Sequence, residues 1–217
     1  GDLWSALRAD EGADLLAEGV VGPALDPAQL EIVSIVQQNS KELQRLIENL
    51  LDYNQLLHRD EVRPQAVALA PLVAGIVESH RLGLERHGLA AVLRDEQAQW
   101  VLDPGKLRAA LDNLVSNAAN HASQDSDVLI HWHVHRNALV IDVANQGCVI
   151  PEDEAERVFE PFFQGSTSRR GAIKGSGIGL SVARECIESQ GGSLRLAQRR
   201  GYSVCFRITL PRPEALA

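Results

Sequence analysis

Lys174 to Leu180 read Lys-Gly-Ser-Gly-Ile-Gly-Leu and lead directly into a helical pattern over Ser181–Gln190. Glycines let a backbone approach phosphate oxygens because they carry no Cβ, and the free N–H groups at a helix N-terminus attract anions. The spacing Gly175-x-Gly177-x-Gly179 matches neither the P-loop nor the Rossmann fingerprint. This stretch therefore predicts either a phosphate-binding loop or a glycine-rich turn that holds no ligand.

A second signal is a helix expected over Asp103–Ala122, on which four polar side chains share one face. Asparagine is a poor helix former, so a cluster of amides on a helix needs a reason. Amide carbonyls are suitable ligands for Mg²⁺, and amide NH₂ groups suit phosphate oxygens. The alternative is an ordinary polar face. The four residues are Asn113, Asn117, Asn120 and His121.

Composition and charge narrow the class of protein. The chain has 217 residues and a net charge of −8, which argues against nucleic acid as a partner. It holds no run of 18 apolar residues, so we expect no membrane span within this sequence. Three cysteines, Cys148, Cys186 and Cys205, fit no metal pattern and are expected to be reduced thiols.

The first part of the chain predicts a helical hairpin. Leu3–Glu18 is expected to form a short helix, and Pro27–His58 a long one without internal Gly or Pro. Apolar residues seven apart form a narrow seam on the long helix, which a second copy would bury in a four-helix bundle dimer. Packing against the rest of the same chain is the alternative. The seam residues are Val36, Leu43, Leu50 and Leu57.

After a linker at Arg59–Pro64, strands and helices are interleaved, and hairpins outnumber crossovers. The fold class expected is α+β: the antiparallel helical hairpin, then an α/β sandwich whose mixed sheet is mostly antiparallel. One hairpin should turn at Arg136-Asn137. The expected helices are Leu69–Arg86, Asp103–Ala122, a short one near Glu152–Val158 and one starting at Ser176; the expected strands are Ala90–Leu93, Trp100–Leu102, Val128–His135, Leu139–Val143, Ser193–Ala197 and Tyr202–Leu210.

Two further blocks lie between the amide helix and the glycine loop, Val143–Pro151 and Val158–Phe163. In order and spacing, the four segments resemble the N, G1, F and G2 boxes of bacterial sensor histidine kinases. The helical hairpin is similar to that family's dimerisation and histidine-phosphotransfer domain. The resemblance implies a hairpin domain over residues 1–60 and an ATP-binding domain over 61–217.

The resemblance also implies ATP and Mg²⁺ as cofactors, a homodimer formed through the hairpin, and a response regulator receiver domain as partner. The chain would be the cytoplasmic portion of an inner-membrane protein, anchored only through segments outside this sequence. Asn117 matches the Mg²⁺ ligand, Asn145 the residue that accepts the adenine amino group, and Gly147 the glycine against which the base docks. The full implied ATP-binding set is Asn113, Asn117, Asn120, His121, Asn145, Gly147, Phe162, Lys174, Gly175, Gly177, Ile178, Gly179 and Leu180.

The lid of the ATP site is expected between the F and G2 boxes. Phe159, Phe162 and Phe163 would anchor its hinge, and the glycines of the G2 box would surround the phosphates. Cations in the lid would neutralise triphosphate charge, or would simply be solvated. These cations are Arg169, Arg170 and Lys174.

Three departures from the family pattern bear on activity. No histidine stands at the phosphoacceptor position, where one alignment places Gly1 and another places nothing. Asn145 replaces an aspartate, which should weaken nucleotide binding about tenfold. Val149 replaces a glycine, at a cost of about 1–2 kcal/mol if that position needs positive φ. An impaired kinase that acts as a dimerisation or regulatory module is therefore an alternative.

Asn113 bears on a further alternative, in which the chain is an ATPase or a serine kinase. ATPases and serine kinases of the same ATP-binding fold place a glutamate four residues before the Mg²⁺ asparagine, where it acts as general base. Asn113 cannot take up a proton in that role, so hydrolysis and serine phosphorylation are disfavoured.

Three histidines alternate along one expected strand, His131, His133 and His135. Alternating residues share a face, and three imidazoles are a ligand set for zinc. Residues two apart on a strand lie some 6–7 Å apart, however, which suits joint ligation poorly. A solvated sheet face is the preferred interpretation.

Overall fold

The computed structural model describes residues 26–37, 39–40, 47, 62–86, 90–94, 99–165 and 177–212. The chain divides into two units, 1–52 and 53–217, and each is considered by itself. In the first unit a helix covers 27–37. Its start is marked by a reciprocal capping box, in which the Gln29 N–H donates to Asp26 Oδ1 and the Asp26 N–H donates to Gln29 Oε1. The helix start expected at Pro27 is confirmed; the rest of the hairpin lies largely outside the described residues.

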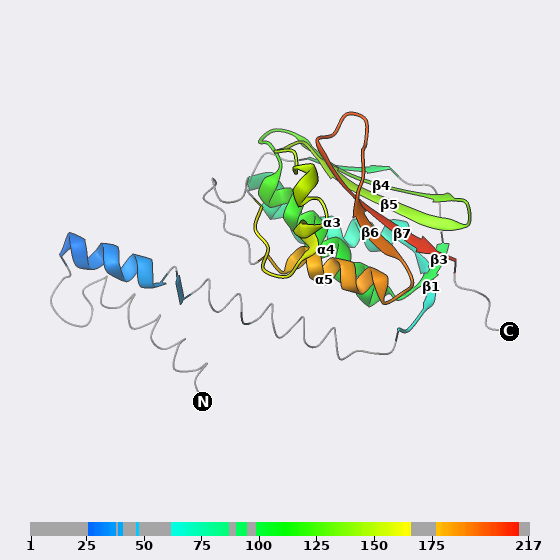
Figure 1. The fold of residues 1–217 in the computed structure, drawn as a ribbon, viewed down its shortest axis with the longest axis horizontal. Helices are drawn as coiled ribbons and strands as arrows, with labels where there is room; N and C mark the ends of the chain where they lie inside the picture. Colours follow the sequence, from blue (N-terminus) through cyan, green and yellow to red (C-terminus); the bar gives the residue numbers. More distant parts are fainter. Residues whose placement is uncertain are drawn as a thin grey trace. The chain divides into compact units, whose positions relative to one another are not determined.

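The second unit is a layer of helices on a five-stranded sheet (Figure 1). The sheet order is β2-β4-β5-β7-β6, with β2 and β4 parallel and the other neighbours antiparallel. A separate two-stranded sheet pairs β1 with β3. The expected α+β class with a mixed, mostly antiparallel sheet is confirmed. The elements are β1 Gln65–Ala68, α3 Leu69–Arg86, β2 Ala90–Arg94, β3 Gln99–Leu102, α4 Pro104–His121, β4 Asp127–His135, β5 Ala138–Asn145, η1 Glu152–Glu154, η2 Arg157–Phe159, α5 Gly179–Glu188, β6 Ser193–Leu196 and β7 Val204–Pro211.

One main hydrophobic core lies between the helices and the sheet. Strands β4, β5 and β7 contribute alternate residues to it, as period-2 patterning requires: Ile130 and Trp132 from β4, Ile141 from β5, and Phe206 and Ile208 from β7. On the opposite sheet face the buried apolar cluster is small. One face of the sheet is therefore fixed by burial, and the other is free to carry polar groups.

The expected β4–β5 turn is confirmed at Arg136 and Asn137. Their φ angles of 46° and 61° are the left-handed pair of a two-residue type I′ hairpin, whose twist matches that of the strands. Because this turn fixes the register, His131 lies opposite Asp142 and Val128 opposite Asn145.

Several expected boundaries are wrong. The helix near Glu152–Val158 is two single 3₁₀ turns, η1 and η2, and the helix expected from Ser176 begins at Gly179. The strand expected to end at Val143 continues to Asn145, since Asn145 still pairs with Val204. The structure also contains β1, which was not expected: the sequence pattern indicated only a linker followed by a helix in this part of the chain.

Asp142 is fully buried on the outer face of the sheet. Arg207 donates to both of its oxygens, at 2.6 and 2.8 Å, and Arg199 donates to Oδ2 at 2.6 Å. Arg199 also contacts His131 Nδ1 at 3.1 Å. The outer face at this point is thus a hydrogen-bonded ion network that crosses β4, β5 and β7.

Candidate functional site

Helix α4 presents the four expected polar residues on the side away from the core. Asp103 caps the helix and Pro104 occupies its first position, so the start is well specified. Leucines at 107, 111 and 114 are fully buried. Asn113 and Asn117 are half-buried and Asn120 and His121 are exposed. Although His121 is exposed, partial desolvation of its ring lowers its pKa below the ordinary value.

The start of α5 packs closely against this face of α4. Asn113 Nδ2 donates to Ala109 O at 2.9 Å, which fixes the orientation of the amide. A Cβ added to Gly179 would lie 2.7 Å from Asn113 Oδ1. A side chain at 179 would displace the Asn113 amide, so the close approach of the two helices favours glycine there, and the structure brings these two expected residues together.

The first turn of α5 presents its backbone N–H groups at the end of the helix that follows the glycine loop. Within the described residues no side chain caps this turn, for which Ile178 is the N-cap. The Ser181 hydroxyl donates to Ile178 O at 2.7 Å, so it does not occupy an N–H group. The N–H groups of the first turn and the helix dipole give this end of α5 a partial positive charge of the kind that suits an anion.

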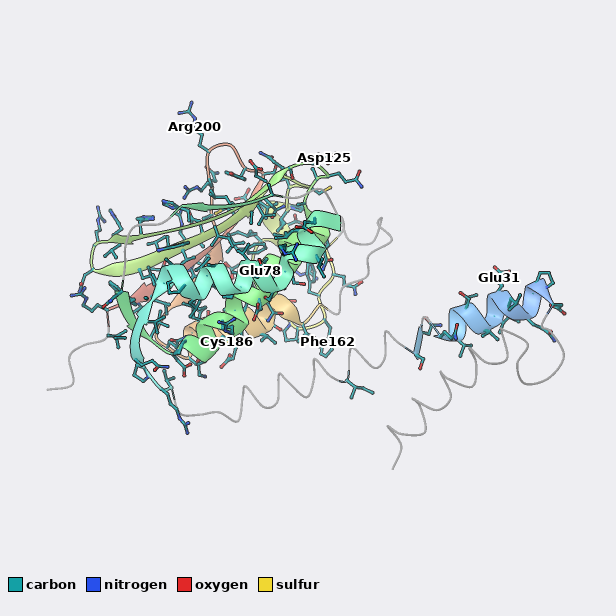
Figure 2. All side chains as sticks on the ribbon, turned by 180° about the vertical axis from the view of Figure 1, so that it is seen from behind. Glu31, Glu78, Asp125, Phe162, Cys186 and Arg200 are labelled. Atoms are coloured by element: carbon teal, nitrogen blue, oxygen red, sulfur yellow. The ribbon has the colours of Figure 1, made fainter. Side chains whose placement is uncertain are left out.

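The two ends of the expected lid are joined at its base. The Phe162 N–H donates to Gly177 O at 2.8 Å. Both residues have positive φ, 65° and 71°. The Phe162 side chain is 60% exposed and lies at the surface of the domain (Figure 2). Phe162 was expected to anchor the hinge of the lid, and the contact that it makes there among the described residues is this backbone hydrogen bond.

The other two phenylalanines, Phe159 and Phe163, pack their rings beside the expected hinge. Phe159 is buried and packs edge-to-face on Phe206, with ring centroids 6.0 Å apart. The Arg157 guanidinium lies 4.5 Å from the centre of the Phe163 ring. The Arg184 guanidinium lies 3.8 Å from the centre of the Phe159 ring and donates to Glu156 at 3.1 Å. Arg184 was missed by sequence reasoning because a cation on one helix face gives no sign of its aromatic partner.

The end of β5 meets the end of α4. Asn145 is buried, and its Nδ2 donates to Gln146 O at 2.9 Å. A Cβ on Gly147 would lie 2.5 Å from His121 O, so only glycine fits there. Val149 has no positive φ. The strain considered for a valine at this position is therefore absent.

Some of the residues expected at the site lie outside the residues that the structure describes. These are Lys174 and Gly175 of the glycine loop and the lid cations Arg169 and Arg170. The described members of the set come together in three contacts: Asn113 with Gly179, His121 with Gly147, and Phe162 with Gly177.

The histidine row is on the outer sheet face, as expected. The rings of His131 and His133 have centroids 5.0 Å apart, and those of His133 and His135 are 6.4 Å apart. Among the described residues no group of three His, Cys, Asp or Glu side chains is placed to hold a metal. The zinc alternative therefore has no support in this structure.

The arrangement of α4, α5 and the end of β5 agrees with the family model for histidine kinase-, DNA gyrase B- and HSP90-like ATPases, which matches residues 102–214. The chain belongs to this family. Within it, the similarity is to sensor histidine kinases: GlrK of Escherichia coli K12 is 44% identical over 201 residues, 93% of this chain and 42% of GlrK. The chain spans about two fifths of that relative's length.

Solved structures show the same fold. Full-length ShkA in complex with AMPPNP matches 94% of this chain and 42% of its own, with a TM-score of 0.70 and 22% identity. The histidine kinase ThkA in complex with the response regulator TrrA matches 98% of this chain and 61% of its own, with a TM-score of 0.67 and 19% identity. No helix in the described ranges has the length and apolar character to cross a bilayer.

Proposed function

We propose that this chain is the nucleotide-binding and dimerising core of a bacterial sensor histidine kinase, with a hairpin domain over 1–60 and an ATP-binding domain over 61–217. In the intact protein the γ-phosphate of ATP passes to a histidine and then to an aspartate of a response regulator. The observation that carries the proposal is the start of α5, seated against the amide face of α4 at Asn113.

The phosphates would bind at the first turn of α5, where backbone N–H groups donate to their oxygens. The Asn117 carbonyl, one turn beyond Asn113, would hold Mg²⁺. When bound, Mg²⁺ neutralises charge that develops on the phosphate oxygens. Asn113 cannot remove a proton from water or a hydroxyl, so the site orients a phosphoryl donor and leaves deprotonation to the acceptor.

The adenine would dock at the end of β5. Asn145 Nδ2 already donates to Gln146 O, so Asn145 Oδ1 would be the atom that accepts from the exocyclic amine of adenine. Gly147 supplies the close backbone approach beside it. A neutral acceptor still selects an amino group, with less binding energy than a carboxylate.

Homodimerisation draws support from the first unit. Ile32, Ile35 and Val36 are each more than half exposed, and their spacing places them on one helix face. An exposed apolar stripe on a helix is typical of a surface that a partner helix buries. The proposed regulator partner rests on the sensor kinase relatives and on the solved complex of ThkA with the response regulator TrrA.

Asn117→Ala tests the proposed site. A fluorescent ATP analogue should bind the wild-type chain with micromolar affinity in Mg²⁺, and binding should weaken at least tenfold in the variant because the metal ligand is gone. Titrations with and without Mg²⁺ measure this. The variant should lose most of the difference that Mg²⁺ makes.

The control for that experiment is Gln124→Ala, which removes an exposed amide just beyond α4. Its affinity should equal that of wild type. Absence of wild-type binding at millimolar nucleotide would refute the proposed function.

Asn145→Asp should tighten nucleotide binding about tenfold, because a charged acceptor contributes roughly 1 kcal/mol more than a neutral one. The same change should lower the melting temperature of the free chain, since the new carboxylate faces Gln146 O where Nδ2 now donates. Titration and thermal unfolding measure the two effects. An unchanged dissociation constant would mean that Asn145 does not contact the base.

A second candidate is a nucleotide-binding module that does not phosphorylate itself. It rests on Asn145, which stands where the family pattern has an aspartate and lowers the expected affinity for nucleotide. If the chain binds ATP but acquires no acid-labile label from γ-labelled ATP, this candidate is favoured over a self-phosphorylating core.

A further inference from the structure

Asp103 lies where three segments of the second unit meet. Its Oδ1 accepts from the N–H groups of Gly105 and Lys106, at 2.9 and 3.1 Å, which caps α4. Its Oδ2 accepts from the Arg63 N–H at 2.9 Å. Its own N–H donates to Gln190 Oε1 at 2.8 Å. A helix cap needs only the first of these three interactions.

The two helices that meet at Asp103 carry opposite walls of the proposed nucleotide site. Helix α4 starts at Asp103 and carries Asn113 and Asn117 some 15–21 Å further along its axis. Helix α5 starts at the proposed anion-binding end and finishes just before Gln190. Because the start of α5 touches Asn113 while its end touches Asp103, the helices run in opposite directions, with the site at one end and Asp103 at the other.

Further hydrogen bonds join α4 and α5 at the end where Asp103 lies. Gln190 Nε2 donates to Cys186 O at 2.9 Å, which holds the Gln190 side chain on the last turn of α5. Lys106, which is buried, donates to the Ser189 hydroxyl at 3.1 Å. The first turn of α4 and the last turn of α5 are therefore joined by side chains on both helices.

The third segment is the entry into the domain. Arg63 lies just before β1, and β1 pairs with β3, which ends at Leu102. Although burial opposes ionisation, the N–H donors of Arg63, Lys106 and Gly105 hold the pKa of Asp103 below its ordinary value. At neutral pH both of its oxygens are therefore acceptors, one for the entering segment and one for α4.

We propose that Asp103 is a positioning residue for the nucleotide site, because its three interactions link the segment entering the domain to the far ends of both site walls. This inference rests on the proposed function for its consequence, the affinity for nucleotide. Its structural part, the joining of α4 and α5, is tested without any ligand.

Asp103→Asn is the decisive variant. Asparagine caps a helix as well as aspartate does, so α4 keeps its start, while the amide NH₂ faces the Arg63 N–H and that hydrogen bond is lost. In the full chain we expect faster amide hydrogen exchange at Asn113–Ala118 and at Gly179–Ala183. We also expect about fivefold weaker binding of a fluorescent ATP analogue in Mg²⁺.

Glu78→Gln is the matched control, because it makes the same chemical change in an exposed ion pair on α3. It should alter neither measurement. Gln190→Met, which removes the link from Asp103 to α5 together with the Gln190 contact to Cys186 O, is the second variant in case Asp103→Asn fails to fold. It keeps the Asp103 cap and the Arg63 hydrogen bond, and it should speed exchange at Gly179–Ala183.

Exchange that rises only between Arg63 and Ala109 would overturn the proposal, because Asp103 would then be a local cap and tether. An unchanged dissociation constant in a chain whose wild type binds nucleotide would overturn it too. If the wild type binds no nucleotide, the proposed function fails, and hydrogen exchange alone still decides the role of Asp103.

Discussion

Gly177→Ala should weaken binding of an ATP analogue by about thirtyfold or more. Gly177 has φ of 71°, which costs an L-residue about 1–2 kcal/mol. A Cβ there would also lie 2.8 Å from Phe162 C and 2.9 Å from Phe163 O. These are backbone atoms that cannot rotate away, so overpacking adds about 1–3 kcal/mol. The turn must shift, and it leads directly into the first-turn N–H groups of α5. Fluorescence titration in Mg²⁺ measures the loss.

Gly201→Ala is the control that separates backbone strain from the steric clash. Gly201 also has positive φ, 89°, but no other described atom lies within 4 Å of a Cβ built there. It should lower the melting temperature slightly and leave the affinity for nucleotide unchanged. Equal affinities for the two alanine variants would show that the contact between Gly177 and Phe162 does not shape the site.

Local chemistry made much of this fold predictable from sequence. Arg136-Asn137 predicted its turn because asparagine tolerates the left-handed conformation, and alternating residues such as Ile130 and Trp132 predicted which sheet face is buried. Asp103-Pro104 predicted the start of α4 from capping alone. The described site contacts at Gly147 and Gly179 follow glycines that the family resemblance had singled out.

What could not be predicted depends on partners far away in sequence. Gln65–Ala68 is a strand only because Gln99–Leu102 pairs with it. Strand β5 continues past Val143 to Asn145 because Val204 continues the ladder on the neighbouring strand. Arg184 gains its role from the Phe159 ring, and no periodicity within α5 encodes that contact.

The burial of Asp142 was the feature least predictable from the sequence. Its position in an alternating strand predicts an outward, solvated side chain, yet it is fully buried. Arg199 reaches it from the loop between β6 and β7, and Arg207 from the neighbouring strand. Asp142 is buried because arginine side chains cover this part of the outer sheet face. The alternation of polar and apolar residues along β5 gives no sign of these side chains from other segments.

Asp142→Ala should destabilise the domain by about 3–5 kcal/mol, because it leaves two guanidinium groups beside a buried site without their carboxylate. The three hydrogen bonds lost are 2.6, 2.6 and 2.8 Å long. The melting temperature should fall by roughly 6 to 20 °C. Glu78→Gln, which breaks an exposed ion pair with Arg81, should leave it unchanged. Equal melting temperatures for wild type and Asp142→Ala would show that the network contributes nothing to stability.

Acidification should remove the same contribution from the wild type. Burial opposes ionisation of Asp142, but hydrogen bonds and charge from Arg207 and Arg199 outweigh it, so its pKa lies below the ordinary value. Because the pKa of Asp142 is lower in the folded state, its ionised carboxylate stabilises the folded state at every pH above the unfolded pKa of about 3.9. This stabilisation is lost as the pH falls through the folded pKa. Urea unfolding at pH 7, 5, 4 and 3 should therefore show the wild type losing stability below about pH 4. Asp142→Asn has no proton to take up there and should lose less. Parallel losses in the two proteins down to pH 3 would show that other carboxylates, among them Asp103, govern acid unfolding.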